Sequence, residues 1–166
     1  IIRNPTKTMS WLGGLFTLKP GVDGIAISKN DQLLVYGAMA HDTLFSVPTA
    51  ALTRAEAGQA ALQVKALGRK PLNDGLSMDK NDNIFITDVE HGSVMKMTPA
   101  GLLSTVVQDV KRLRWADALS FGPDGWLYVA DSAIPDQMLR SKAHMRAQAP
   151  YRIFRFKPGT EGVPGQ

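Results

Sequence analysis

Apolar and polar residues recur three times along the chain in the same order. Each copy begins with an Asp and a small residue, continues as an alternating apolar run, crosses a polar turn and returns as a second apolar run. The copies lie at 23–36, 74–87 and 117–130. Alternation with a period of two predicts a strand with one packed face, and the Asn, Asp, Gly and Pro residues of the connections favour tight turns. Each copy is therefore predicted to form an antiparallel hairpin.

Further strands are predicted after each hairpin. Third strands are expected at 43–47, 93–97 and 151–156, and fourth strands at 62–66 and 102–107. Four antiparallel strands make a propeller blade, and a repeat of about 40 to 50 residues is typical of such arrays. The sequence thus predicts an all-β fold, a β-propeller, with residues 1–166 as a single partial domain. The expected blades are 21–67, 72–108 and 115–158, and 1–20 is expected to be the remnant of a preceding blade.

Two segments interrupt the blades, and the number of blades leaves the ring open. Residues 50–61 and 135–149 are rich in helix-forming residues, so short helices are expected there. Closed propellers usually have four to eight blades. We therefore expect either that the chain is part of a longer one or that two copies complete one ring.

The strand directions predict that polar side chains gather at one end of the blades. In an antiparallel hairpin, the residue before the first strand and the residue after the second strand lie at the same end. Because the innermost strands line the channel of a propeller, this end is a channel rim and the predicted ligand site. Its predicted residues are Asp23, Asn73, Asp74, Asp88, His91, Trp115, Asp117 and Asp131. Nearby loops add His41, Asp42 and Glu90.

These residues allow more than one interpretation. Carboxylate and amide oxygens suit a hard cation such as calcium or magnesium. Each Asp can instead cap backbone N–H groups of a neighbouring loop. Trp115 either lines the channel mouth or packs between blades, and His41 and His91 are either site residues or solvated loop residues.

Composition removes several classes of function. The chain has 166 residues and no cysteine, which excludes disulfides, zinc–thiolate sites and cysteine nucleophiles. No apolar run approaches the length of a membrane span. The net charge is +4, but no nucleic-acid motif accompanies it, so no nucleic-acid partner is expected. Nucleophile-elbow, phosphate-loop and His-Glu-x-x-His motifs are also absent from the sequence.

The ordered motifs resemble a known family. Segments 21–28, 72–91 and 113–129, followed by 151–155 and a Pro-Gly tail, are similar to successive blades of the major royal jelly protein/yellow family, especially its bacterial members. The likeness runs from Gly21 to Gln166. It implies a six-bladed propeller related to the gluconolactonase/senescence-marker group, with an N-terminal half missing here. It also implies a secreted or periplasmic location.

The same resemblance implies a metal site. Lactonase relatives hold a divalent metal at the channel rim through Asn-Gly and Asp-Gly motifs that open blades. Asp23-Gly24 and Asp74-Gly75 match these motifs in position, so the resemblance implies Asp23 and Asp74 as ligands, with calcium the first candidate. Asp23 stands where the relatives have Asn, Asp117 is followed by Ala118 rather than Gly, and the remaining acidic ligand would come from an earlier blade.

Three functions are open at this point. The first is the binding of a small-molecule ligand at the rim without catalysis. The second is metal-dependent hydrolysis of a lactone-like ester, with Asp23 and Asp74 as metal ligands. The third is a scaffold whose exposed blade faces engage a protein partner.

Overall fold

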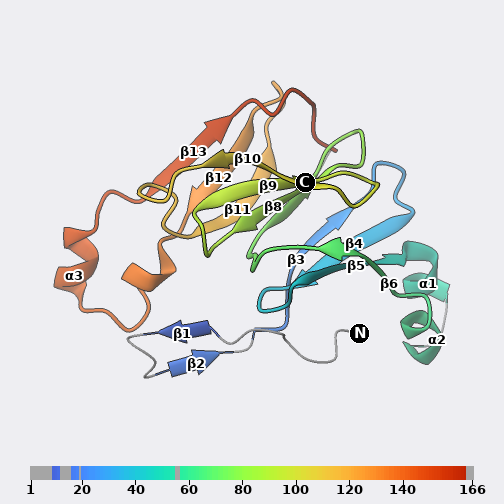
Figure 1. Cartoon of the computed structure of the whole chain (residues 1–166), viewed down its shortest axis with the longest axis horizontal. Helices are drawn as coiled ribbons and strands as arrows, with labels where there is room; N and C mark the ends of the chain where they lie inside the picture. Colours follow the sequence, from blue (N-terminus) through green and yellow to red (C-terminus); the bar gives the residue numbers. More distant parts are fainter. Residues whose placement is uncertain (1–8, 12–15, 19, 55–56, 164–166) are drawn as a thin grey trace.

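The chain folds as a row of three antiparallel sheets (Figure 1). The computed structural model describes residues 9–11, 16–18, 20–54 and 57–163. A separate hairpin pairs β1 (Met9–Trp11) with β2 (Phe16–Leu18). The first sheet contains, in order, β3 (Val22–Ile27), β4 (Leu33–Ala38), β5 (Thr43–Pro48) and β6 (Lys65–Arg69).

The other two sheets repeat this order of strands. The second sheet contains β7 (Leu76–Met78), β8 (Ile84–Asp88), β9 (Ser93–Met97) and β10 (Leu103–Gln108). The third sheet contains β11 (Ala116–Phe121), β12 (Leu127–Asp131) and β13 (Arg152–Phe156). In each sheet, neighbouring strands in the sequence are neighbours in space, as in a meander.

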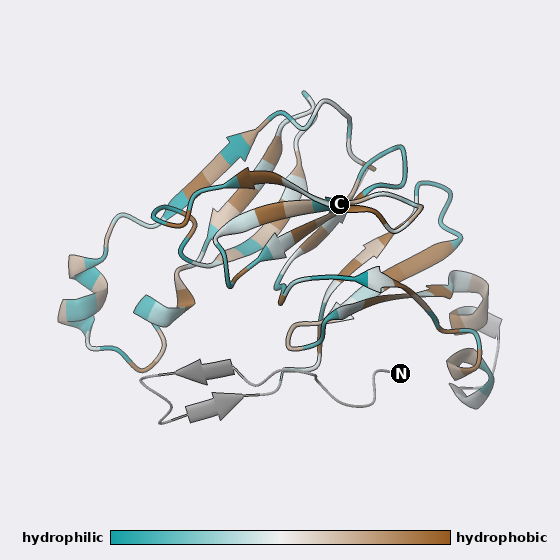
Figure 2. Ribbon diagram, viewed as in Figure 1, coloured by the Kyte–Doolittle hydropathy of each residue, from teal (hydrophilic) through white to brown (hydrophobic). Residues whose placement is uncertain are grey.

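Apolar cores fill the spaces between the sheets. Ala26 and Leu44 of the first sheet pack with Ile86 of the second, and Phe85 of the second packs with Leu127 of the third. Strand β8 is therefore buried on both faces, and Figure 2 shows apolar colouring along the strands with polar colouring in the connections. The inner strand β7 contacts both β3 and β11. Sheets that stack in this way through their inner strands are arranged as propeller blades, as predicted.

The predicted strands differ from the observed ones at the outer positions. The hairpin strands and all three third strands lie where they were expected, within one or two residues at their ends. The fourth strand of the first sheet is β6 at Lys65–Arg69, not 62–66, because helix α2 (Ala57–Ala61) and the turn after it occupy the preceding residues. The third sheet has three strands in the described part of the chain. Much of the expected remnant at 1–20 lies outside the described residues.

Helices occupy the two interruptions. Helices α1 (Thr49–Arg54) and α2 follow β5, and a 3-10 turn η2 (Ile134–Asp136) and helix α3 (Lys142–Ala147) lie between β12 and β13. Helix α3 begins after Ser141, whose side chain accepts a hydrogen bond from the backbone N–H of His144 at 3.1 Å. In the part of the chain that is described, no helix is both long and apolar enough to cross a membrane.

Candidate functional site

The repeated Asp occupies a β-bulge in the first and third sheets. In the first sheet, Asp23–Gly24 together face the single residue Gly37 of β4. In the third sheet, Asp117–Ala118 together face Ala130 of β12. A bulge places one extra residue in a strand and changes the direction in which its side chain points. The bulge thus gives the blade-opening Asp an orientation that simple alternation would not give it.

The corresponding Asp of the second sheet is held by a threonine. The side-chain oxygen of Thr87 accepts hydrogen bonds from the backbone N–H groups of Asp74 and Gly75, both at 3.0 Å. The backbone N–H of Thr87 donates to the carbonyl of Gly75 at 3.2 Å. Thr87 ends the second apolar run of its repeat, and no role for it was predicted from the sequence. It fixes the backbone from which the Asp74 side chain projects.

Glycine allows the successive blade openings to approach one another closely. A Cβ atom added at Gly24 would lie 2.8 Å from the carbonyl oxygen of Asp74. One added at Gly75 would lie only 2.1 Å from the carbonyl oxygen of Asp117. The small residue after the Asp therefore serves the contact with the next blade at the first two openings. At the third opening this position holds Ala118, which is exposed.

The three blade-opening carboxylates influence one another electrostatically. Burial raises the pKa of Asp74 to about 6; the hydrogen bond from Trp115 opposes this shift, and the negative charges of Asp117 and Asp23 add to it. Burial, followed by the charge of Asp117, also raises the pKa of Asp23. No ion pair found among the described residues involves any of the three. The structure thus gathers like charges at one place without a basic partner from the described segments.

Trp115 connects the interior to this acidic group. It is only 6% exposed and packs with Met39, Ala40 and Leu72. Its indole N–H donates to Oδ2 of Asp74 at 2.7 Å. Trp115 therefore packs between blades, which is one of the two alternatives that the sequence left open, and it also orients the Asp74 carboxylate.

The side chain of Asp131 has a structural role. Its side chain is fully buried; Oδ1 accepts the backbone N–H of Trp115 at 2.8 Å, and Oδ2 accepts Nε of Arg114 at 3.0 Å. Arg114 also donates to the carbonyls of Gln148 and Pro150, at the end of the insertion between β12 and β13. Both oxygens of Asp131 are therefore engaged in holding Trp115 and the insertion in place.

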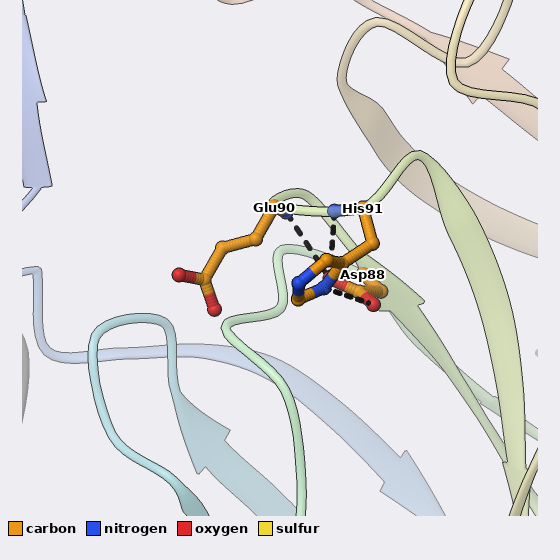
Figure 3. Close-up of side chains that lie close together, drawn as sticks. All are labelled: Asp88, Glu90 and His91. Atoms are coloured by element: carbon orange, nitrogen blue, oxygen red, sulfur yellow. Dashed lines mark hydrogen bonds and ion pairs between the residues drawn. The ribbon is translucent and has the colours of Figure 1, made fainter.

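Asp88, Glu90 and His91 form a second polar group in the loop after β8 (Figure 3). Buried Asp88 accepts hydrogen bonds from the backbone N–H groups of Glu90 and His91, at 3.1 and 3.2 Å, and from the Ser93 hydroxyl at 3.2 Å. Nδ1 of His91 lies 2.9 Å from Oδ2 of Asp88. The three side chains offer ligand atoms within 4.8 Å of one another, beside a pocket of about 360 Å³. Asp88 primarily shapes this turn and orients the His91 ring.

The remaining predicted residues are placed differently. Asn73 is fully buried; its Nδ2 donates to the carbonyl of Asp74 at 3.1 Å, and its Oδ1 has no hydrogen-bond partner in the described structure. His41 is half-buried, and its Nδ1 accepts the backbone N–H of Thr43 at 3.0 Å. A Cβ atom added at Gly24 would lie 2.9 Å from Nδ2 of Asn73, so Asn73 lies against the same blade openings as Asp23 and Asp74.

The raised pKa of Asp74 predicts how stability depends on pH. Between its ordinary pKa of 3.8 and the folded value of about 6, the folded state holds this proton more tightly than the unfolded state. The contribution of Asp74 to stability should therefore fall as the pH rises from 4 to 6 and then remain constant. Urea unfolding at pH 4, 5, 6 and 7 should show this fall in the wild type relative to Asp74→Asn, which keeps an oxygen acceptor for Trp115. A constant difference between the two proteins across this range would contradict the raised pKa.

Comparisons with known proteins give a consistent family and fold. A sequence model of the family described as major royal jelly protein matches residues 3–148. No curated protein sequence gives a significant match. Among solved structures, a calcium-binding protein, regucalcin, from Agrobacterium tumefaciens is 18% identical with a TM-score of 0.59. The match covers 90% of this chain and 49% of that protein.

Two further solved structures show the same fold. A gluconolactonase from Xanthomonas campestris is 12% identical with a TM-score of 0.62, and the match covers 86% of this chain and 46% of that protein. A luciferin-regenerating enzyme is 17% identical with a TM-score of 0.59, and the match covers 86% of this chain and 48% of that protein. The chain thus spans about half the length of these propellers, and their likeness establishes its fold.

Proposed function

Because the chain belongs to the major royal jelly protein family, we propose that it binds a small molecule at the channel rim around Asp23, Asp74 and Asp117. The observation that carries this proposal is the gathering of three carboxylates, where burial and then the neighbouring negative charges raise the pKa values of Asp23 and Asp74. Grouping like charges costs folding free energy. Proteins keep such costly arrangements most often where they serve a function.

We propose that a divalent cation binds at this group of residues. Asp23 and Asp74, the ligands that the family resemblance implied, are near enough to Asp117 for its charge to raise the pKa of both, and carboxylate oxygens are the ligands that calcium prefers. The ligand atoms of these three residues lie farther apart than those of Asp88, Glu90 and His91. A bound cation would offset both the burial of the Asp74 carboxylate, which is the main cause of its raised pKa, and the smaller repulsion from Asp117 and Asp23. Calcium is the first candidate, supported by the similarity to a calcium-binding regucalcin. The buried oxygen of Asn73 and the engaged oxygens of Asp131 are not part of this proposed ligand set.

A lactonase-like hydrolase is the second candidate function. The specific observation that favours it is the Asp74 carboxyl, whose pKa of about 6 suits proton transfer near neutral pH. Trp115 holds this carboxyl in one orientation through its indole N–H. A cation at the rim would polarise an ester carbonyl. The similarity to gluconolactonases supports the same reaction class.

The third function, a protein-interaction scaffold, concerns the outer face of the first sheet. Val22, Ile25, Ile27 and Leu33 are 54%, 58%, 37% and 40% exposed. An apolar face of this kind is suited to contact with another sheet. In this function, the exposed apolar face of the first sheet would engage a protein partner.

Trp115 provides a way to test ligand binding. A Trp11→Phe/Trp126→Phe variant leaves Trp115, which contacts Asp74, as the only tryptophan. Adding a sugar lactone with calcium should change its emission, and the change should be absent when Asp74 is also replaced by Asn. Hydrolysis of the lactone under the same conditions would favour the hydrolase, whereas a saturating emission change without turnover would favour binding alone. No change in emission and no turnover would contradict both functions.

A further inference from the structure

A pocket lies between the first and second sheets, at the end of the blades opposite the rim. It has a volume of about 220 Å³ and is bordered by the β3–β4, β7–β8 and β9–β10 turns. Figure 1 shows these turns, coloured blue, green and yellow, near one another at one end of the sheets. The backbone N–H of Lys29 in the first turn donates to Oδ1 of Asp82 in the second at 3.2 Å. The walls of the pocket therefore come from two sheets that both have four strands in the structure.

The interior of this pocket is apolar. Val35 of β4, Met78 of β7 and Ile84 of β8 line it and belong to the core between the two sheets, where each is at most 3% exposed. Leu67 of β6 and Leu33 of β4 extend the apolar surface, and Leu33 is 40% exposed. An apolar cavity of about 150 Å³ holds one benzene molecule. The pocket is therefore large enough for one aromatic ring with a short substituent.

The polar residues of the pocket lie in the turns that border it. They are Ser28, Asn30, Gln32, Asp82 and Thr98. Among the described residues that line the pocket, only Asp82 carries a charge. Its Oδ2 lies 3.9 Å from Nζ of Lys29, which is too far for a hydrogen bond. This oxygen can therefore accept a hydrogen bond from a ligand, whereas the carboxylate would repel an anion.

From the apolar interior, its size and the carboxylate at its border, we propose that this pocket binds a neutral molecule with one aromatic ring and a hydroxyl group. A flat ring suits the space between two facing sheets, and the thioether of Met78 makes favourable contacts with aromatic rings. The ligand hydroxyl would donate to Oδ2 of Asp82. A ligand ammonium would approach the ammonium of Lys29, so a cationic ligand is disfavoured. Because the blade-opening carboxylates lie at the other end of the blades, this inference is independent of the function proposed for the rim.

NMR of methyl groups locates the ligand directly, because the apolar side chains of the pocket carry methyl groups. Benzyl alcohol, titrated into protein labelled at isoleucine and methionine methyl groups, should shift the signals of Met78 and Ile84 in a saturable way. Met39 and Ile134, which pack with Trp115, are internal controls whose signals should not shift. Toluene lacks the hydroxyl and benzoate carries a negative charge, so each should bind at least about tenfold more weakly. Equal binding of toluene or benzoate would overturn the assigned class of ligand.

Variants test the same site. Leu33→Trp should fill part of the pocket and weaken the binding of benzyl alcohol about tenfold. Leu62→Trp is the matched control, since Leu62 is 78% exposed and does not line the pocket; it should bind like the wild type. Asp82→Asn should narrow the difference between benzyl alcohol and toluene, and Asn tolerates the φ of 58° at this position.

Circular dichroism spectra check that these variants fold. The proposal would be overturned if the signals of Met78 and Ile84 showed no saturable shift, or shifted no more than those of Met39 and Ile134. Unchanged binding of benzyl alcohol by folded Leu33→Trp would also overturn it.

Discussion

Replacing Gly75 by alanine is expected to destabilise the protein by about 3 kcal/mol or more, the upper end for a residue that overfills a packed site. The new Cβ would lie 2.1 Å from the carbonyl oxygen of Asp117 and 3.1 Å from the Cα of Ala118. Both are backbone atoms, so no side-chain rotation relieves the overlap. The second and third sheets would have to move apart at their blade openings.

Urea unfolding monitored by circular dichroism measures this loss. Gly58 provides the matched control, since a Cβ there meets no atom within 4 Å and its position lies in helix α2. Gly58→Ala should leave the free energy of unfolding unchanged or raise it by up to about 1 kcal/mol. If Gly75→Ala were as stable as Gly58→Ala, the close contact between the second and third blade openings would be wrong.

The periodicity of the sequence predicted the hairpins well because it reports directly on which face of a strand is buried. It also predicted the turn residues: Asp31 and Asp82 have φ angles of 58°, a conformation that Asp tolerates better than most residues. The prediction that Asp23, Asp74 and Asp117 lie at the same end of their blades followed from the antiparallel directions of the strands alone. These features depend on residues that are close together in the sequence, so the pattern of apolar and polar residues is enough to predict them.

The details of the site depend on partners that are distant in the sequence. The indole of Trp115 reaches Asp74 across 41 positions, and no local pattern signals that hydrogen bond. Asp131 and Asp23 were both predicted to lie at the rim, yet Arg114 and the backbone N–H of Trp115 hydrogen-bond to the carboxylate of Asp131, whereas Asp23 stays largely exposed. A bulge is equally hard to read, because one extra residue at a strand end leaves the alternation after it intact. The small residue that follows the Asp at each blade opening was the available signal.

The acidic group also illustrates how a site can be maintained at the expense of stability. Asp74 is buried, and its ionised form is disfavoured by burial and by two neighbouring charges. Removing its charge by Asp74→Asn should therefore stabilise the empty protein at neutral pH. With a divalent cation bound, the wild type should instead be more stable than Asp74→Asn, because the cation interacts with the wild-type carboxylate much more strongly than with an amide.

Calcium binding is the second change expected to have a large effect. A ligand present at 100 times its dissociation constant stabilises a folded protein by about 2.7 kcal/mol. The wild type should gain stability of this order with calcium, whereas Asp74→Asn should gain little. Asp124→Asn is a suitable control, since Asp124 is exposed in the turn after β11, at the other end of the blade. It should behave like the wild type.

Calorimetric titration of calcium into the wild type, Asp74→Asn and Asp124→Asn tests most directly whether the blade-opening carboxylates form a cation site. We expect one saturable binding event in the wild type and in Asp124→Asn, and binding at least about tenfold weaker in Asp74→Asn. Equal calcium affinity in all three proteins, or no binding to the folded wild type, would contradict it.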